Sequence, residues 1–300
     1  MRFAFIQEQQ KQSESDLPIR HLCRALNVSA SGYYDYVRRQ NSPSPSANRR
    51  LELSEKIASV HAISRQTYGS PRICRQLRDE GETVSEKTVA KIMKTLQIQG
   101  KSPWKKNPYT TGSRHDQPVA ENLLNRQFEA TAANQKWASD ITYIETDEGW
   151  LYLAVVIDLF SRRVVGWATA DHMRADLVCE AMSRAIMQRS IRQKDHAEDS
   201  GKLLHHSDRG GQYASGDFQK LLEDYGMCCS MSRKGNCWDN AVVESFFGTL
   251  KSELDEPFAT REIAHAKLFD YIEVFYNRMR LHSTLNYMNP AAFEAMHQAA

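Results

Sequence analysis

The sequence predicts an α/β core that follows a helical front region, and two observations support this division. From about residue 134 onward, runs of β-branched and aromatic residues alternate with amphipathic stretches. Before that point, apolar residues recur mainly every three or four positions, which is typical of helices. At 300 residues the chain is long enough to fold into more than one domain.

The first 60 residues are predicted to be a helical region. Two short helices are expected over residues 18–38, an outline that fits either a helix-turn-helix or a plain helical hairpin. Residues 40–48 are rich in Ser, Pro and Asn and therefore predict a linker. A further helix is expected over residues 49–64.

Residues 61–100 predict a helix-turn-helix-like unit. Ser70 and Pro71 form a favourable helix start, and Ser85 is placed to cap a second helix. The polar face of that second helix carries three lysines, Lys87, Lys91 and Lys94. Such a basic helix suits DNA phosphates and groove edges, although a solvated lysine face would give the same pattern.

Residues 101–133 predict a basic linker, in which Trp104 and Tyr109 interleave with Lys, Arg, Pro and Gly. A segment of this composition can follow a DNA backbone and stack on a base or sugar. An ordinary flexible linker is the alternative that the composition leaves open.

Charge is distributed unevenly along the chain. Residues 1–120 carry a net charge of +9 and residues 121–300 a net charge of −7, which leaves +2 overall. A basic front and an acidic back predict a nucleic-acid-binding region and a separate chemical module. The alternative is that the solvated helix faces of the front half are simply rich in Lys and Arg.

Cysteine usage and hydropathy predict a soluble protein of a reducing compartment. The six cysteines form no CxxC pair and do not stand at zinc-ligand spacing with histidines. No apolar stretch reaches the ~18–20 residues that a membrane span requires. The N-terminal apolar run is also too short for a signal peptide. We therefore expect a cytoplasmic protein with no membrane partner.

The predicted core spans residues 134–256, and residues 257–300 predict a helical extension of it. Three strands are followed by a helix, a strand, a helix, a strand and two helices. Their expected ranges are 137–146, 150–157, 164–169, 174–189, 202–207, 216–225, 227–231, 240–254 and 260–277. This order alone indicates only an α/β fold.

Three carboxylates are the main candidates for chemistry. Asp140 lies in a strand-like run, Asp208 follows a strand before a Gly-rich turn, and Glu244 lies in a helix-like run, with 35 residues between the last two. Acids on two strands and a helix can converge, and convergent oxygen ligands suit a pair of Mg²⁺ or Mn²⁺ ions. Two such ions about 3.5–4 Å apart support in-line phosphoryl displacement. The pattern predicts a site that cuts and joins phosphodiesters.

Six segments of the chain, in this order, carry a resemblance to a known family. They are YGSPRICRQL, NQKWASDITYIET, LAVVIDLFSRRVVGWA, HHSDRGGQY, SRKGNCWDNAVVESFFGTLK and YNRMRLHSTLNYMNPAAF. With the 35-residue gap, the chain closely resembles transposases of bacterial insertion sequences whose second reading frame encodes a retroviral-integrase-like core. The resemblance covers nearly the whole chain.

The resemblance implies a ribonuclease-H-like, integrase-type core preceded by helix-turn-helix DNA-binding helices. It implies a DDE-type transposase, in which Asp140, Asp208 and Glu244 are catalytic and bind two divalent ions, Mg²⁺ or Mn²⁺. Hydrolysis at the end of the element would free a 3′-hydroxyl, which would attack a second phosphodiester without a covalent protein intermediate.

The same resemblance implies several partners. They are double-stranded DNA at the element ends and the target, further copies of the chain on that DNA, and an upstream-frame protein or a frameshift fusion to it. A bacterial cytoplasmic location follows, at the nucleoid when the protein is bound to DNA.

Two rival functions remain open. A nuclease of the same fold would cut DNA without joining it, and a strand-transfer assay separates the two. A non-catalytic DNA-binding protein derived from a transposase is the second rival. Against it, all three acids and Lys251 are present.

Other polar residues near the three acids are assigned less direct roles. Asp158 ends an apolar run and enters a turn, so we interpret it as structural. His205 and His206 precede Asp208 and are expected to be strand residues or to support the ligands, because a site for hard ions prefers oxygen. Asp239 or Asn240 is expected to cap the helix of Glu244.

Several basic residues are predicted to contact DNA around the acids. Lys251 lies seven residues after Glu244, on the same side of one helix and ~10 Å further along it. Arg233 and Lys234 lie in a basic loop expected to be mobile and to cover the site. The tail that carries Arg278, Arg280 and His282 is expected to pack on the core and to offer further DNA contacts.

Overall fold

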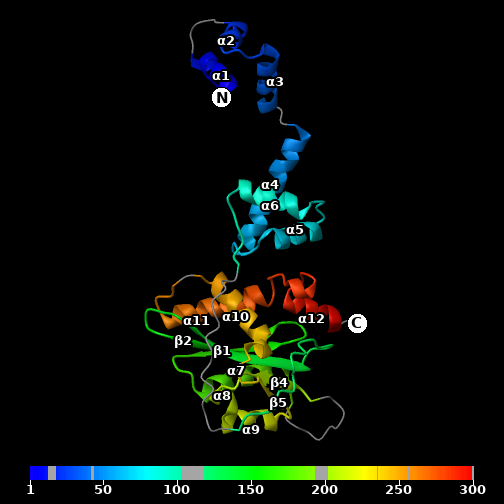
Figure 1. The fold of residues 1–300 in the computed structure, drawn as a ribbon, viewed down its shortest axis with the longest axis vertical. Helices are drawn as coiled ribbons and strands as arrows, with labels where there is room; N and C mark the ends of the chain where they lie inside the picture. The colour runs from blue at the N-terminus through cyan, green and yellow to red at the C-terminus, as the bar shows by residue number, and fades with distance from the viewer. Residues whose placement is uncertain are drawn as a thin grey trace.

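The N-terminal helices form a small unit of their own. The computed structural model describes residues 1–12, 18–41, 44–102, 118–192, 202–234, 236–255 and 257–298. Helices α1 (Arg2–Gln12), α2 (Ile19–Ala25) and α3 (Ala30–Asn41) lie at one end of the molecule (Figure 1). They close around Ile6, Cys23 and Tyr33. Helix α1 was not predicted. Trp104 and Tyr109, the aromatic residues of the predicted basic linker, lie outside the described residues.

Three further helices form the helix-turn-helix-like unit. Helix α4 (Pro45–Ile63) packs against both α5 (Ser70–Asp79) and α6 (Glu86–Thr95). The predicted linker over residues 40–48 is therefore shorter than expected, because α4 begins at Pro45 behind the cap of Ser44. The expected domain boundary at residue 60 falls within α4. Ser85 caps α6 as predicted, whereas α5 begins after Gly69 with no side-chain cap.

This helical unit contacts the C-terminal segment of the core. The guanidinium group of Arg65 pairs with Asp270 at 2.6 Å. The hydroxyl of Tyr68 accepts a hydrogen bond from the backbone N–H of Leu281 at 2.6 Å, and Arg72 Nε donates to the Leu281 carbonyl at 2.9 Å. Apolar residues on both sides of this contact belong to one hydrophobic cluster. The helical unit is thus joined to the core by packing as well as by the chain.

A five-stranded sheet forms the centre of the core. Its strands are β1 (Lys136–Ile144), β2 (Leu151–Asp158), β3 (Val164–Ala170), β4 (Leu204–Ser207) and β5 (Cys228–Met231). Their order is β3-β2-β1-β4-β5. The first three strands pair antiparallel, and β4 and β5 run parallel to β1. The expected order of strands and helices is confirmed.

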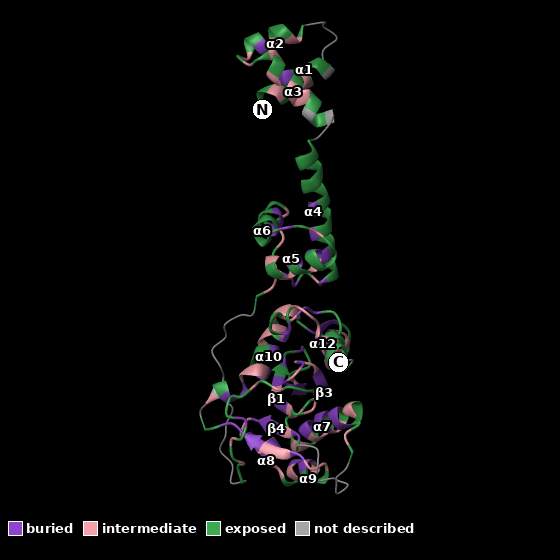
Figure 2. Cartoon of the chain, turned by 90° about the vertical axis from the view of Figure 1, so that its right-hand side faces the viewer, coloured by how far each residue is buried: buried purple, intermediate pink, exposed green. Residues whose placement is uncertain are grey.

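Helices cover both faces of this sheet (Figure 1). One face packs on α7 (Ala175–Arg189) and α9 (Gly216–Asp224), and the other on α10 (Ala241–Glu253) and α11 (Arg261–Phe269). Alternate strand residues therefore enter different cores. Figure 2 shows the buried residues concentrated in the sheet and the elements against it. Gly166 on β3 allows a close approach, because a Cβ there would lie 2.3 Å from the Ala181 carbonyl oxygen of α7.

The C-terminal extension is more structured than the sequence indicates. Beyond α11 the chain forms a π-helix, η2 (Asp270–Tyr276), and a short 3₁₀ turn, η3 (Ser283–Leu285). Helix α12 (Pro290–Gln298) then returns to the sheet. Its buried Glu294 accepts hydrogen bonds from Ser161 at 2.5 Å, Arg163 at 2.9 Å and Arg189 at 3.0 Å. These partners are far from Glu294 in sequence. Helix α12 was therefore not predicted, because the contacts that hold it leave no local signal in the sequence.

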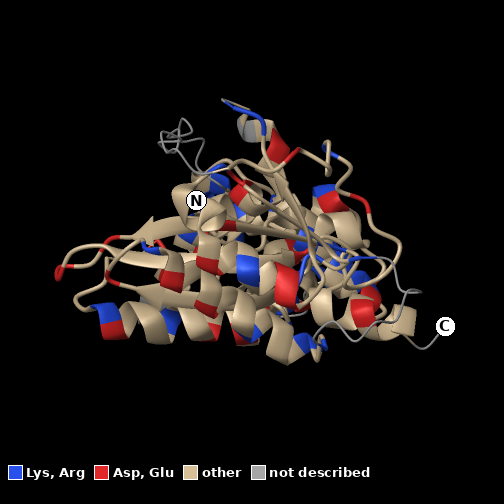
Figure 3. Ribbon diagram, turned by 90° about the horizontal axis from the view of Figure 1, so that it is seen from below, with Lys and Arg blue, Asp and Glu red and all other residues tan. Residues whose placement is uncertain are grey.

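The surface of the core carries both signs of charge. Seen from the core end of the molecule, Lys and Arg are interspersed with Asp and Glu along helices and loops (Figure 3). Within the ranges that the structure describes, no helix is long and apolar enough to cross a membrane.

Candidate active site

Asp140 lies in the middle of the central strand β1 and faces helix α10. It is the cross-strand partner of Val155, which belongs to the hydrophobic cluster that also contains Val243 and Phe246 of α10. The Asp140 carboxylate accepts a hydrogen bond from the Ile141 N–H at 2.8 Å. Burial raises its pKa well above the ordinary value, and the nearby charges of Asp208 and Glu244 raise it further. The three predicted acids are therefore electrostatically coupled through Asp140.

Asp208 reaches the same level of the sheet from the neighbouring strand. In the parallel pairing of β1 with β4, Trp137 is level with His205 and Ala138 with His206. The same register two residues later brings Asp208 level with Asp140. The Asp208 carboxylate accepts a hydrogen bond from the Gly210 N–H at 2.8 Å, and a Cβ at Gly210 would lie 3.0 Å from that oxygen. Glycine thus permits the tight turn around Asp208, as expected.

Glu244 lies in the first turn of α10, which packs on β1. The residue is exposed, yet the protein atoms around its carboxylate raise its pKa by desolvation. The short 3₁₀ helix η1 (Cys237–Asn240) leads directly into α10. Asn240, one of the two predicted caps, occupies the N-cap position of α10, but its side chain makes no capping hydrogen bond. The Asn240 side chain instead donates to the Ser139 carbonyl at 3.1 Å and so ties α10 to β1.

The three acids approach one another without forming a closed cage. In the described part of the chain, no three His, Cys, Asp or Glu side chains are grouped so that they could hold a metal ion. Like charges repel at short range, and Asp140 and Asp208 each turn an oxygen to a nearby backbone N–H. The three carboxylates nevertheless offer only oxygen donors, which hard divalent ions prefer. The chemistry of the donor set fits such an ion, although the side chains are not gathered around one point.

A buried tyrosine lies beside this set. The Tyr213 side chain is 2% exposed, and the charges of Asp140 and Asp208 contribute to its raised pKa after burial itself. Its hydroxyl has no hydrogen-bond partner in the described structure. Its ring packs edge-on against the ring of Phe218, and this contact holds the phenol in place beside the acids. The sequence analysis did not select this residue, because a tyrosine after a Gly-rich turn carries no signal of its own.

Asp158 lies in surroundings typical of a carboxylate with a structural role. It is fully buried and pairs across the sheet with Trp137, at the start of β1. Its carboxylate accepts hydrogen bonds from the backbone N–H groups of Asn134 at 2.8 Å and Phe160 at 2.9 Å. Arg189 lies 3.6 Å away. The predicted structural role fits these contacts, since the carboxylate closes a turn and pairs with a buried arginine.

His205 and His206 are buried strand residues, as expected. His205 Nε2 lies 2.8 Å from the Ser139 hydroxyl, next to Asp140. His206 Nδ1 lies 2.8 Å from the hydroxyl of Ser230 on β5. Burial lowers the pKa of His205 to about 3 and that of His206 to about 4, so both are neutral at pH 7. They join the strands that carry the acids.

Lys251 lies at the edge of a cleft on the α10 side of the sheet. Its ammonium nitrogen is 4.3 Å from the centre of the Tyr143 ring, which packs edge-on against Trp150. The cleft has a volume of about 700 Å³, and Lys251, Tyr143 and Trp150 help to line it. Lys251 and Glu244 are both exposed on α10, as the helical spacing predicts.

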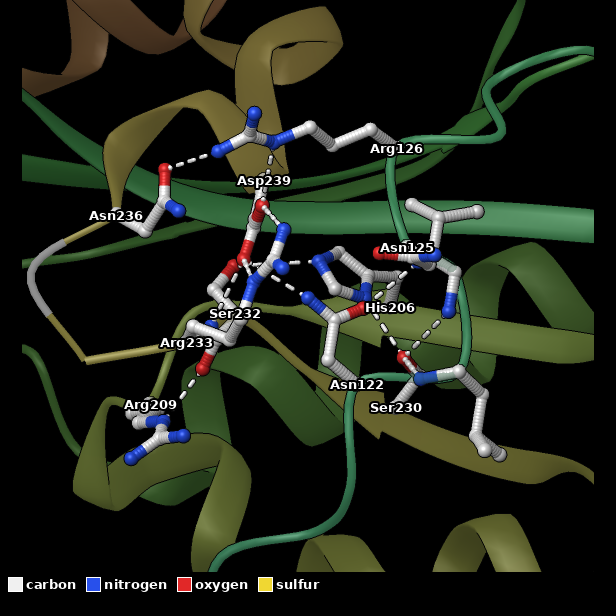
Figure 4. A network of polar contacts seen from close by, with 12 residues as sticks. Asn122, Asn125, Arg126, His206, Arg209, Ser230, Ser232, Arg233, Asn236 and Asp239 are labelled. Carbon is white, nitrogen blue, oxygen red and sulfur yellow. Dashed lines mark hydrogen bonds and ion pairs between the residues drawn. The ribbon is translucent and has the colours of Figure 1, made fainter.

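The described part of the basic loop before α10 is held by a buried carboxylate (Figure 4). Asp239 is fully buried, and its carboxylate accepts hydrogen bonds from Arg233 Nη2 at 2.8 Å and Arg126 Nε at 2.9 Å. The Asn122 side chain donates to the same carboxylate at 2.8 Å. We call these four residues the Asp239 clamp. Arg233 and Lys234, both selected as DNA contacts, are exposed, but the Arg233 guanidinium also pairs with Asp239.

The remaining predicted DNA contacts lie elsewhere. Lys87, Lys91 and Lys94 are exposed on α6, far along the chain from the three acids. In the tail, Arg278 is exposed, but Arg280 is buried and pairs with Glu253 at 2.7 Å. The packing role expected for the tail is therefore confirmed for Arg280.

Comparisons with known proteins agree with this architecture. Residues 130–237 and 244–297 match the integrase core domain, and residues 48–106 match an HTH-like domain. Over 296 residues the chain is 42% identical to the transposase InsF for insertion sequence IS3A of Escherichia coli (strain K12), covering 98% of each chain. The chain belongs to the insertion-sequence transposase family.

This transposase has other relatives of the same kind. It is 42% identical over 282 residues to the insertion element IS600 uncharacterized 31 kDa protein of Shigella sonnei, covering 93% of this chain and 100% of the relative. Among solved structures, it resembles the HTLV-2 integrase catalytic core domain in complex with magnesium. That likeness has a TM-score of 0.41 and 19% identity, over 55% of this chain and 99% of the viral one. The ribonuclease-H-like, integrase-type fold expected for the transposase is confirmed by the family match and the sheet.

Proposed function

We propose that Asp140, Asp208 and Glu244 are the metal ligands and catalytic residues of this transposase, and that they hold two Mg²⁺ or Mn²⁺ ions. The reaction is cleavage at a 3′ end of the element, followed by strand transfer into a target. The observation that carries the proposal is geometric: the register of β1 with β4 brings Asp140 and Asp208 to one level of the sheet, and α10, which carries Glu244, packs on β1. Two ions bound there would stabilise the attacking and leaving oxygens of an in-line displacement.

The protein contributes position and charge to this reaction. Asp140 is fixed in the central strand, and Asp208 is fixed by the Gly210 turn, so both oxygen donors are held by rigid elements. Asn240 ties the start of α10 to β1 and thereby brings Glu244 over the same point. The mutual repulsion of the acids is relieved when cations bind, which favours the loaded site.

DNA contacts are proposed on two surfaces. Lys251 would hold a phosphate near Glu244, and Lys234 and Arg233 would lie beside the same DNA, with Arg233 contributing the part of its side chain that remains exposed. Lys87, Lys91 and Lys94 would place α6 on the element end. The functional units are residues 1–60, 61–100, 101–133, 134–256 and 257–300, with the helix of α4 shared between the first two.

Further copies of the chain on the same DNA complete the proposed assembly. An upstream-frame protein, or a frameshift fusion to it, would supply additional DNA-binding helices. The same proposal places the protein in the bacterial cytoplasm, at the nucleoid when it is bound to DNA.

Strand transfer on DNA that carries the ends of the element tests this proposal. With Mg²⁺ or Mn²⁺ present, Asp140→Asn, Asp208→Asn and Glu244→Gln should each abolish both cleavage and joining. Binding to the same DNA should stay nearly unchanged, because no DNA-contacting charge is removed. Full activity in any one variant would exclude that residue from the site. Cleavage without joining by the parent would favour the nuclease alternative.

A further inference from the structure

The Asp239 clamp connects two segments that are distant in sequence. Asp239 follows Arg233 by six residues, but Arg126 and Asn122 belong to the segment that enters the core after the predicted basic linker. We call residues 121–126 the strap. Charge-assisted bonds from Arg233 hold the pKa of Asp239 well below its usual range, and those from Arg126 lower it further. The clamp is therefore an ion cluster that stays charged at physiological pH.

The strap is itself fixed to the sheet. The hydroxyl of Ser230 on β5 accepts hydrogen bonds from the N–H groups of Leu123 at 2.9 Å and Leu124 at 3.2 Å. Since that hydroxyl accepts twice, its own proton is available to His206 Nδ1, 2.8 Å away on β4. Leu124 is 1% exposed. The strap thus covers the edge strand and is connected to the strand that ends at Asp208.

The other side of the clamp lies at the start of the helix that carries Glu244. Asp239 and Asn240 end η1, and α10 continues from Ala241. Asp239 is bound to the strap, while Asn240 is bound to the Ser139 carbonyl on β1. At 1.5 Å per residue, Glu244 lies about 6 Å along the axis from Asn240. These two adjacent anchors therefore define where α10 begins.

A third contact links the same loop to the turn of Asp208. Arg209, the residue after Asp208, donates through Nε to the Ser232 carbonyl. The Ser232 hydroxyl lies 3.2 Å from His206 Nε2 (Figure 4). The loop before α10 is consequently held by the strap on one side and by the end of β4 on the other.

We propose that Asp239 is a positioning residue for strand transfer. Through the strap, it fixes where α10 begins and so holds Glu244 on the side of β1 from which it can join Asp140 and Asp208 when cations bind. The proposal rests on the proposed function, because it assigns Glu244 to the metal site. It also makes the strap, which follows the linker from the DNA-binding helices, a structural part of the active site.

The chain offers a matched control for this proposal. Glu294 is also a buried carboxylate between two arginines, Arg163 and Arg189, but it holds α12 rather than α10. Asp239→Asn and Glu294→Gln both remove one buried charge from such a cluster. Both variants should lower the melting temperature of the full chain, since each leaves arginines without their carboxylate. Only Asp239→Asn should change the metal site.

Mn²⁺ binding to the DNA-free protein, followed by electron paramagnetic resonance, provides the decisive readout. Asp239→Asn should weaken Mn²⁺ binding about 10-fold or more and raise the Mn²⁺ concentration needed for half-maximal strand transfer by a similar factor. Glu294→Gln should leave both values as in the parent. Equal Mn²⁺ behaviour in the two variants would overturn the proposal.

A milder pair of variants covers the case in which Asp239→Asn does not fold. Arg126→Gln leaves Arg233 and Asn122 on Asp239 but removes the charged bond between the strap and Asp239. It should therefore weaken Mn²⁺ binding less than Asp239→Asn does, and Arg126→Lys should restore part of the loss. An Arg126→Gln protein with the Mn²⁺ affinity of the parent would contradict the proposal. Glu244→Gln tests the metal-ligand role of Glu244 separately from the positioning role of Asp239. If this variant retains Mn²⁺ binding and joining, the proposed function is wrong, whatever the Asp239 variants show.

Discussion

Asp208 lies close enough to Asp140 that its negative charge raises the pKa of Asp140. The two residues belong to parallel neighbouring strands, and the pairing of β1 with β4 brings them to one level of the sheet. Glu244 adds to the same effect from α10. A buried Asp140 whose ionisation is opposed by two neighbouring acids is costly for the fold unless a cation binds beside it.

Asp158→Asn should act through stability. Asp158 accepts two backbone hydrogen bonds with its two oxygens, and an asparagine amide nitrogen would face one of those donors. We expect a loss of about 1–3 kcal/mol in the free energy of unfolding. Urea unfolding measures the loss, and strand transfer at low temperature should persist in the folded fraction. A stable but inactive variant would show that Asp158 takes part in the chemistry.

Lys251→Ala should weaken strand transfer without changing metal affinity. The change removes a point charge seven residues beyond Glu244 but leaves all three carboxylates in place. The effect should be largest at low ionic strength and shrink as salt rises, because salt screens the phosphate contact that Lys251 makes in the parent. Lys251→Glu should be worse than Lys251→Ala, since it brings a negative charge near a phosphate. If Lys251→Glu joins ends as well as the parent at physiological salt, DNA does not pass over this part of α10.

Replacing the three lysines of α6 together should reduce DNA affinity. All three are exposed on one helix of the HTH-like domain, Lys87, Lys91 and Lys94. If each contacts a phosphate, the slope of log affinity against log salt should fall by about 0.9 for each lysine lost. Fluorescence anisotropy with element-end DNA at several salt concentrations measures this slope. An unchanged slope would mean that α6 faces away from DNA.

Acid should destabilise the fold through buried histidines before it protonates the carboxylates whose pKa is lowered. Burial, and then the charge of Arg280, lower the pKa of His282 from 6.5 to about 4, and His205 and His206 are lowered in the same direction. The unfolded chain therefore binds protons below pH 6.5 that the folded chain does not. The free energy of unfolding should fall between pH 6.5 and about 4, by at most ~1.4 kcal/mol per pH unit for each histidine.

Denaturation at each pH from 7 to 4 checks this expectation, with His282→Asn as the comparison. Above pH 4.5, the free energy of unfolding of His282→Asn should fall less steeply with decreasing pH than that of the parent. The reason is that the unfolded variant lacks the imidazole of His282, which binds a proton in the unfolded parent. Carboxylates with a lowered pKa, such as Glu294, stabilise the fold until they become protonated. Their contribution to the free energy of unfolding is therefore lost only at more acidic pH. An identical slope in parent and variant would contradict a buried neutral His282.

Much of the architecture was predictable because it depends on local patterns. The β-branched and aromatic runs of β1–β3 are typical of strands buried on both faces of a sheet, and the amphipathic spacing of α7 and α10 follows from helix geometry. Family motifs then identified the three acids. Local signals failed for α12 and for Asp239: a helix start with Asp and Asn before it predicts a cap, but both side chains bind distant partners.

The sequence by itself determined the order of strands and helices, the family, and which three acids to consider, because these depend on residue type and spacing. Only the tertiary structure decided which charged side chains form ion pairs with one another. Arg126 and Asp239 are separated by more than a hundred residues and carry no common motif, yet the exposed arginine forms an ion pair with the buried carboxylate. Their pairing arises because the edge of the sheet requires a covering segment and a buried carboxylate requires cations. Both requirements become visible only when the chain is folded.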